Sequence, residues 1–333
     1  MEIDFVVLWV DGNDPVWQRE KAKYQGKTQD GSNAPNRFRD WGLMPYWFRA
    51  AERFAPWVRR IHFVTCGHFP AFLNLKHPKL HHVRHEDFMP QEALPTFSSH
   101  AIEMNMHRIP GLAERFVYFN DDMFLLRPAP KTAFFRDGLP CTCGGEHPIE
   151  LVGSIGIWQH AAVNGLGVVN AHFDKREQVK KYGRRYVDRA YRWQDNIRTR
   201  ALEKLFPSRF TGFRNLHAPA AYCKSTFEAV WNTEPELLAR TTAHRFRSAE
   251  DVNQWVCLWW QVASGQFAPY NTDNAVLCAD ESTVDELCSI IREQSHDMLC
   301  INDPEEPVDF EKLSARLQGA FEMILPEKSG FEL

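Results

Sequence analysis

The sequence has no segment that would cross a membrane or direct secretion. Its 333 residues contain no apolar run of roughly 18 residues, the length that a membrane-crossing helix needs. The N-terminus, Met1 to Asp4, has no basic region followed by an apolar core, so no signal peptide is expected. We therefore expect a cytoplasmic protein, whose membrane contact, if any, is peripheral and on the inner face.

Several catalytic and metal-binding motifs are also missing. The eight cysteines form no CxxC pair, which argues against a zinc ribbon or a thioredoxin site. We expect them to be free, mostly buried thiols. The sequence has no GxxxxGK[ST], GxGxxG, GxSxG or HExxH, which argues against an ATP P-loop, a dinucleotide fingerprint, a hydrolase elbow and a zinc protease.

Charge is ordinary in amount and uneven in distribution. Hydrophobic residues make up 44% and charged residues 25%, as in globular proteins, and the net charge is −4. Residues 174–214 hold 13 Lys and Arg against 5 Asp and Glu, whereas residues 273–311 hold 12 acidic residues and one Arg. The basic stretch suits a phosphate-rich ligand or an anionic membrane surface, with a solvated helical face as the alternative. We expect no nucleic-acid partner.

Alternating strand and helix patterns predict an α/β fold with a mainly parallel sheet. Near-continuous apolar runs, several of which end in turn residues, are typical of buried strands. The predicted strands are residues 3–10, 60–67, 81–85 and 115–122. The predicted helices are residues 42–57, 98–108, 175–205 and 309–325. A further helix is predicted to begin at Ser248, with Asp251 in its first turn.

Two of the predicted strands end in carboxylates. Asp11 and Asp14 follow the first strand, and Asp121 and Asp122 follow the strand that begins near residue 115. Ligands of open α/β sheets bind beyond the carboxyl ends of the strands, so both loops could face one site. Neighbouring carboxylates repel unless a cation or proton lies between them, and Mg²⁺ bound to a sugar-nucleotide diphosphate would suit them. The alternative is that Asp11 and Asp14 only cap turns.

Histidine and arginine supply further candidates. His100 and Glu103 are three residues apart, a spacing that puts both on one face of a helix. His100 could act as a general base or phosphate donor, and His217, Arg245 and Arg247 could supply a base and charge clamps for a phosphoryl oxygen. Each histidine could instead be a satisfied structural residue.

Four blocks of sequence resemble the Stealth family of capsular and exopolysaccharide phosphotransferases. The first is DFVVLWVDGNDPVW at residues 4–17, in which only Leu8 departs from the residue we expect. The second block comprises NRFRD at 36–40, LPTFSSHAIE at 94–103 and NDDMFLLRP at 120–128. The third block is residues 212–231 around HAP. The fourth block comprises residues 300–303 and LPEKSGFE at 325–332. Four blocks in this order span nearly the whole chain.

The resemblance implies a fold and a reaction. The fold would be nucleotide-sugar-transferase-like (GT-A-like), with helical insertions. A UDP-sugar, most commonly UDP-GlcNAc, would donate hexose-1-phosphate to a sugar hydroxyl of a glycan or polysaccharide acceptor, with release of UMP. The chain would be one catalytic domain, in which residues 1–135 bind the donor, 140–250 form a basic acceptor side, and 250–333 close the site.

The resemblance also implies roles for single residues. Asp11, Gly12 and Asp14 would line the nucleotide end of the donor pocket. Donor contacts would also come from Arg37, Asp40, Glu103, Arg245 and Arg247. Asp121 or Asp122 would hold Mg²⁺ (or Mn²⁺) or accept the acceptor proton, with Asn302 and Asp303 as further metal ligands. His217 is the preferred base, and His100 is its rival.

Three other functions stay open at this stage. A metal-dependent glycosyltransferase would use the same carboxylates but release UDP. A phosphatase with Asp11 as nucleophile would need a second Asp at position 13, where the sequence has Asn. A glycan-binding protein without catalysis would stack sugars on its tryptophans.

Overall fold

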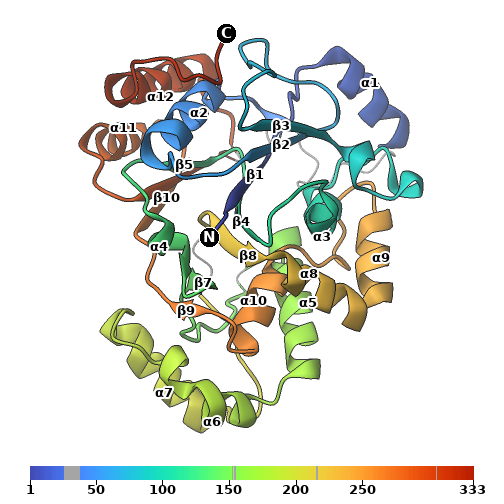
Figure 1. Cartoon of the computed structure of the whole chain (residues 1–333), viewed down its shortest axis with the longest axis vertical. Coiled ribbons are helices and arrows are strands. Elements are labelled where there is room, and N and C mark those ends of the chain that lie inside the picture. The colour runs from blue at the N-terminus through green and yellow to red at the C-terminus, as the bar shows by residue number, and fades with distance from the viewer. Residues whose placement is uncertain (26–37, 152, 154, 215–216, 305) are drawn as a thin grey trace.

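A five-stranded sheet forms the centre of the molecule, and the strand order is β3-β2-β1-β4-β8 (Figure 1). We describe it from a computed structural model, in residues 1–25, 38–151, 153, 155–214, 217–304 and 306–333. The first four strands are parallel, and β8 pairs antiparallel with β4. The strands are β1 (Asp4–Leu8), β2 (Ile61–Thr65), β3 (Leu80–Arg84), β4 (Arg115–Phe119) and β8 (Ala220–Cys223).

Helices cover both faces of this sheet, which explains its nearly continuous apolar strands. Phe5 and Val7 face a core shared with helices α2, α11 and α12. Val6 and Tyr118 face a second core shared with α3, α8, α9 and α10. The helices are α1 (Pro15–Tyr24), α2 (Met44–Phe54), α3 (Ser99–Asn105), α4 (Lys131–Phe134), α5 (Ile157–His172), α6 (Lys175–Tyr186), α7 (Trp193–Leu205), α8 (Lys224–Thr233), α9 (Pro235–Ala243), α10 (Trp255–Ala263), α11 (Val284–Glu293) and α12 (Phe310–Ile324).

Two small sheets extend the central one. The sheet of β5 (Met123–Leu125), β11 (Met298–Asn302) and β10 (Asn274–Cys278) begins shortly after the loop that follows β4. The sheet of β6 (Phe135–Arg136), β7 (Leu139–Thr142) and β9 (Ala268–Pro269) leads toward the end of the molecule that carries α6 and α7. Among the described helices, none combines the length and the apolar character that a bilayer crossing requires.

The four predicted strands are confirmed, but two predicted helices are wrong in extent. The single helix predicted for 175–205 is two helices, because a turn closes between Asp188 and Tyr191 and the Asn196 side chain bonds the Asp188 backbone. The helix expected to open at Ser248 begins instead at Trp255. Asp251 is therefore not in its first turn. The Asp251 carboxylate contacts His100 and His244 and accepts a bond from the Ser248 amide.

A buried ion pair fixes the start of the central sheet. Asp4 is fully buried on β1, and its carboxylate accepts hydrogen bonds from Arg59 Nε at 2.8 Å and from the Ala113 amide at 2.8 Å. His62 Nε2 of β2 lies 3.0 Å from the same carboxylate. Burial alone would raise the pKa of Asp4, but the bonds from His62, Arg59 and Ala113 outweigh burial and lower it. Asp4 thus joins β1 to β2 and to the loop before β4.

We expect Asp4→Ala to lower the free energy of unfolding by about 3 kcal/mol, since removing one partner leaves buried polar groups without their charge partner. Urea denaturation at neutral pH measures this loss. Asp285→Ala is the matched control, because Asp285 pairs with Arg316 while 84% of its side chain is exposed. An exposed pair contributes less than about 1 kcal/mol.

The free energy of unfolding that Asp4→Ala loses should also depend on pH. Because the folded-state pKa of Asp4 lies below the ordinary value of 3.8, its contribution is fully present above that value. It disappears as pH falls through the lower folded pKa. The difference between wild type and Asp4→Ala should therefore shrink on acidification. A difference that stays constant, or equals that of Asp285→Ala, would contradict this role.

Candidate functional site

A cavity of about 250 Å³ opens at the carboxyl edge of the central sheet. Its walls come from the segments that follow three adjacent parallel strands, with Trp9 after β1, Cys66 after β2 and Asn120 after β4. The parallel register places Val7 opposite Phe119 and Leu8 opposite Val64, so the three strands end at about the same level. This is the position at which open α/β sheets bind ligands.

Four carboxylates line this cavity. They belong to Asp40, Asp121, Asp122 and Asp303. Burial raises the pKa of Asp121 well above its ordinary value, and the charges of Asp122, Asp40 and Asp303 raise it further. The pKa of Asp40 is also raised, first by burial and then by the charge of Asp11. So much negative charge in a partly desolvated cavity favours a bound cation or proton.

The second sheet delivers the C-terminal members of this cluster. Antiparallel pairing of β5 with β11 places Cys300 opposite Met123, and the Ile301 amide donates to the Asp122 carbonyl at 2.9 Å. Asn302 and Asp303 follow directly and line the cavity. Trp41 Nε1 donates to Asp303 Oδ1 at 2.8 Å, which fixes that carboxylate.

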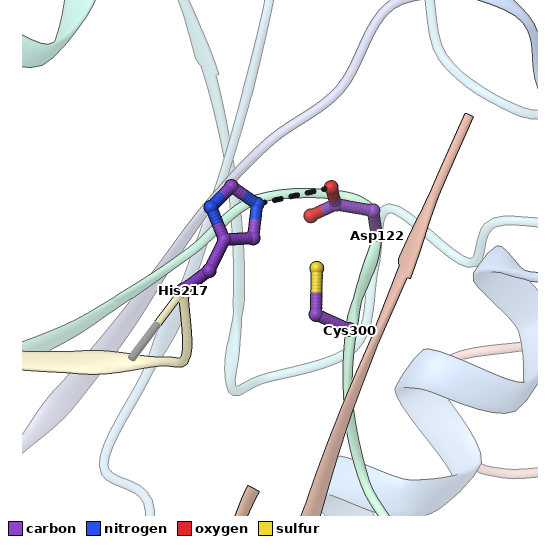
Figure 2. A group of neighbouring side chains, drawn as sticks. All are labelled: Asp122, His217 and Cys300. Carbon is purple, nitrogen blue, oxygen red and sulfur yellow. Dashed lines mark ion pairs between the residues drawn. The ribbon is translucent and has the colours of Figure 1, made fainter. Parts of the chain in front are cut away.

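His217 lies on the wall of this cavity and faces Asp122 (Figure 2). Its Nε2 atom is 3.6 Å from Asp122 Oδ2, and Asp122, His217 and Cys300 present potential metal-ligand atoms within 4.8 Å of one another. Burial lowers the pKa of His217, but the contact with Asp122 and the charge of Glu103 outweigh burial, so its pKa is raised. Burial and the neighbouring Asp122 raise the pKa of the Cys300 thiol, which keeps the sulfur protonated.

A second cavity of about 140 Å³ adjoins the first. Four residues line both cavities: Ser99, Asn120, His217 and Arg247. Glu103 and His100 line the second cavity alone, as the predicted shared helix face requires. Glu103 accepts bonds from the Tyr118 hydroxyl at 3.2 Å and the Gln254 amide at 3.1 Å.

His100 is held by a buried carboxylate. Its Nδ1 atom lies 3.2 Å from Asp251 Oδ2, and His244 Nδ1 lies 2.6 Å from Asp251 Oδ1. Asp251 is fully buried, whereas His100 keeps a small exposed fraction of 5%. Because one carboxylate orients both imidazoles, the position of His100 is fixed relative to the second cavity.

The first acidic loop makes local contacts. The Asp14 side chain caps α1 through the Val16 amide at 2.7 Å and lies 2.9 Å from His68 Nδ1. Asp11 accepts from the Asn13 amide, a turn bond within the loop. A Cβ atom at Gly12 would come within 1.9 Å of the Phe38 carbonyl oxygen, so this close approach requires glycine. None of the three appears among the residues that line the two cavities.

Of the three arginines predicted to contact the donor, only one lines the cavities within the described part of the chain. Arg37 lies outside the described residues. Arg245 donates to the Pro95 carbonyl at 2.7 Å, stacks its guanidinium over Tyr24 and lines neither cavity. Arg247 lines both cavities and donates to Ser99 Oγ at 2.9 Å.

Sequence reasoning missed three residues of this region. Arg39 lines the first cavity, and its buried Nη1 atom has no hydrogen-bond partner among the described residues. Trp158 and Arg214 line the second cavity. The signal for Arg39 was present, since it lies in the NRFRD block, but nothing in the sequence shows which arginine of that block faces the site. Arg214 lies in the third block, residues 212–231, in which only His217 was singled out, and Trp158 lies outside all four blocks.

Comparison with known proteins matches three conserved regions of one family. Residues 1–29 match Stealth protein conserved region 1, residues 37–141 match conserved region 2, and residues 216–258 match conserved region 3. These regions contain the acidic loop after β1, the Asn120–Asp122 turn and His217.

Full-length relatives agree with these matches. The chain is 37% identical over 340 residues to the receptor polysaccharide phosphotransferase WefC of Streptococcus gordonii, covering 100% of this chain and 99% of that protein. It is 38% identical to the capsular polysaccharide phosphotransferase WcwK of Streptococcus pneumoniae, with coverage of 100% and 99%. The exopolysaccharide phosphotransferase cps2G of Lactiplantibacillus plantarum is 36% identical, with coverage of 99% and 96%. With regions 1 to 3 present in order and relatives aligned over their whole length, the chain belongs to the Stealth family.

Proposed function

We propose that the protein is a polysaccharide phosphotransferase that moves hexose-1-phosphate from a UDP-sugar to a sugar hydroxyl and releases UMP. UDP-GlcNAc is the first donor to test. The product would be a phosphodiester-linked capsular polysaccharide or exopolysaccharide, in keeping with the names of the full-length relatives. The observation that carries the proposal is His217, which faces Asp122 on the wall between two adjoining cavities.

The larger cavity suits the donor. A nucleotide-sugar-transferase-like (GT-A-like) arrangement would seat the nucleotide at the carboxyl edge of the sheet, where this cavity opens. Arg39 and Arg247 are the cationic side chains that line it, and the buried Nη1 atom of Arg39 needs a hydrogen-bond acceptor. A diphosphate supplies such acceptors, and the planar guanidinium fits phosphate oxygens. Arg247 keeps the role expected of it, and Arg39 joins it in place of Arg245.

The residues of the carboxylate cluster fit a divalent cation. Asp122 Oδ1 is buried without a hydrogen-bond partner among the described residues, and the pKa of Asp121 is raised first by burial and then by the charges of Asp122, Asp40 and Asp303. Asp122, Asn302 and Asp303 would hold Mg²⁺ or Mn²⁺, because these ions favour oxygen ligands and substrate phosphates. When bound, the cation would neutralise charge on the diphosphate.

Proton transfer falls to His217. Its Nε2 atom faces Asp122, and we assign its Nδ1 atom to the acceptor hydroxyl because His217 also lines the smaller cavity. As the acceptor oxygen bonds to the phosphorus next to the sugar, its proton passes to Nδ1, and the phosphorus–oxygen bond to UMP breaks with the electron pair leaving on UMP. Asp122 stabilises the imidazolium that forms, and its contact already raises the pKa of His217. The rest of the rate would come from in-line positioning and charge stabilisation.

The released nucleotide identifies the reaction. We expect UMP when the protein is incubated with UDP-GlcNAc, Mg²⁺ and a glycan acceptor, because attack at phosphorus leaves UMP. Chromatography of the nucleotides measures it, with EDTA and omission of acceptor as controls. Release of UDP would mean attack at carbon and a glycosyltransferase. Absence of both nucleotides with every donor sugar tested would favour a glycan-binding protein.

Asp122→Asn should lower the rate of UMP formation at least about 100-fold, the scale of losing one electrostatic group at a reacting centre. The fold should persist, because Asn keeps the size of the side chain. Steady-state kinetics together with urea denaturation separate the two effects. Asp285→Asn removes an exposed carboxylate on α11 and should leave the rate unchanged. A fully active, folded Asp122→Asn would overturn the assignment.

Trp158 provides a test of the acceptor cavity. It lines the smaller cavity while 55% of its surface is exposed, so its ring is available to stack on a sugar. We expect Trp158→Ala to raise the KM for acceptor about fivefold, in line with about 1 kcal/mol for an aromatic contact. The KM for donor should not change. Phe69→Ala is the control, because Phe69 is an exposed aromatic residue that lines neither cavity. Equal effects of Trp158→Ala on both substrates would argue against a separate acceptor cavity.

A further inference from the structure

Helix α7 turns an apolar stripe toward solvent. Trp193, Ile197, Ala201 and Leu205 are four residues apart and all exposed, and Phe206 follows at the end of the helix. The exposed fractions are 68% for Trp193, 59% for Ile197, 70% for Leu205 and 52% for Phe206. Helices of globular proteins normally turn such a stripe toward the core. Three large apolar side chains on one face of a helix, with the exposed Phe206 directly after its end, indicate an interaction site.

The opposite side of α7 forms ion pairs and hydrogen bonds with the rest of the protein. Asp195 is buried and forms ion pairs with Arg198 at 2.5 Å and Arg214 at 3.3 Å. The buried Thr199 hydroxyl accepts a bond from the Glu146 amide at 2.9 Å. The apolar stripe is therefore the outward side of a helix whose inner side is already occupied, and not a core face left without a neighbour.

The exposed side chains of α6, α7 and the residues next to them in the sequence are strongly basic. Between residues 174 and 209, nine exposed side chains are basic and only one, Glu177, is acidic. The basic ones are Arg176, Lys180, Lys181, Arg184, Arg189, Arg192, Arg200, Lys204 and Arg209. We call these residues and the apolar stripe the α6–α7 surface. Figure 1 shows both helices at one end of the molecule, away from the central sheet.

We propose that the α6–α7 surface docks the protein peripherally on an anionic lipid bilayer. Basic side chains are attracted to anionic headgroups, and each contributes about 1 kcal/mol near the surface. Tryptophan and aliphatic side chains insert at the boundary between headgroups and acyl chains, while long basic side chains reach back to the phosphates. The combination of an exposed Trp193 with Ile197, Leu205 and Phe206 amid these cations matches both requirements.

Two other occupants fit less well. A second copy docked through the same surface would bring two sets of like charges together, which repel. A soluble polyanion, such as a phosphodiester polymer, would use the cations but would leave the apolar stripe exposed to water. The bilayer satisfies charge and apolar area together. This inference concerns a surface outside both cavities and does not depend on the proposed reaction.

Sedimentation with vesicles tests the proposal. We expect the protein to bind vesicles of phosphatidylglycerol and phosphatidylcholine at least about tenfold more tightly than vesicles of phosphatidylcholine alone, and added salt should weaken binding. The double variant Trp193→Ala, Ile197→Ala removes apolar contacts and should weaken binding about tenfold or more. Arg200→Gln with Lys204→Gln should weaken it to a similar extent through lost charge.

Matched controls keep the experiment decisive. Met323→Ala removes an apolar side chain that is 68% exposed on α12, and Arg19→Gln with Lys23→Gln removes two exposed charges four residues apart on α1. Neither should change vesicle binding by more than about twofold, since neither lies on the α6–α7 surface. Circular dichroism checks that all variants fold.

Three results would overturn the proposal. The first is vesicle binding that the α6–α7 variants and the controls weaken equally, or no vesicle binding at all. The second is binding to soluble polyphosphate that depends on Arg200 and Lys204, without binding to vesicles. This result would assign the surface to a polyanion. The third is a dimer that light scattering detects in the wild type and that Trp193→Ala with Ile197→Ala dissociates.

Discussion

The parallel pairing of β1 with its neighbours is the constraint on which the site depends. Parallel strands in register end at the same edge, so the segments after β1, β2 and β4 meet there, and the contact between Asp14 and His68 joins two of them. Asp4 secures this register from within, because one buried carboxylate binds Arg59, His62 and the Ala113 amide. The polar network at the amino end of the sheet thus supports the acidic cavity at the carboxyl end.

Electrostatics then define what that cavity can bind. Four carboxylates with few cations create a negative site, which opposes a diphosphate unless a metal ion accompanies it. Arg39 and Arg247 supply compensating charge on the walls. The Asp122–His217 pair adds an imidazole whose pKa is raised, so it is a stronger base than a free histidine. Negative charge, two guanidiniums and one imidazole form a combination suited to phosphoryl chemistry.

The end of the molecule that carries α6 and α7 has its own core and its own charge. Tyr186, Phe210 and Trp259 belong to a cluster separate from the two that cover the central sheet. Lys175 and Glu146 form an ion pair inside this region, both almost fully buried. Asp195 links α7 to Arg214 on the wall of the smaller cavity. One ion pair on the inner side of α7 thus reaches a residue of the cavity that we assign to the acceptor.

The sequence by itself determined the family, the four parallel strands and the presence of carboxylates at strand ends, because these depend on apolar runs and turn residues within a short stretch of chain. Only the tertiary structure decided which residues share a cavity. Asp122, His217 and Cys300 meet because β5 pairs with β11 and the loop before β8 returns to the same edge. Only the structure shows that Arg247 lines both cavities while Arg245 bonds the Pro95 carbonyl. It also shows that Asp251, predicted in the first turn of a helix, is a buried partner of His100. A local pattern fixes the residue type and the element, whereas the direction a side chain faces and the partner it meets depend on packing between segments far apart in the chain.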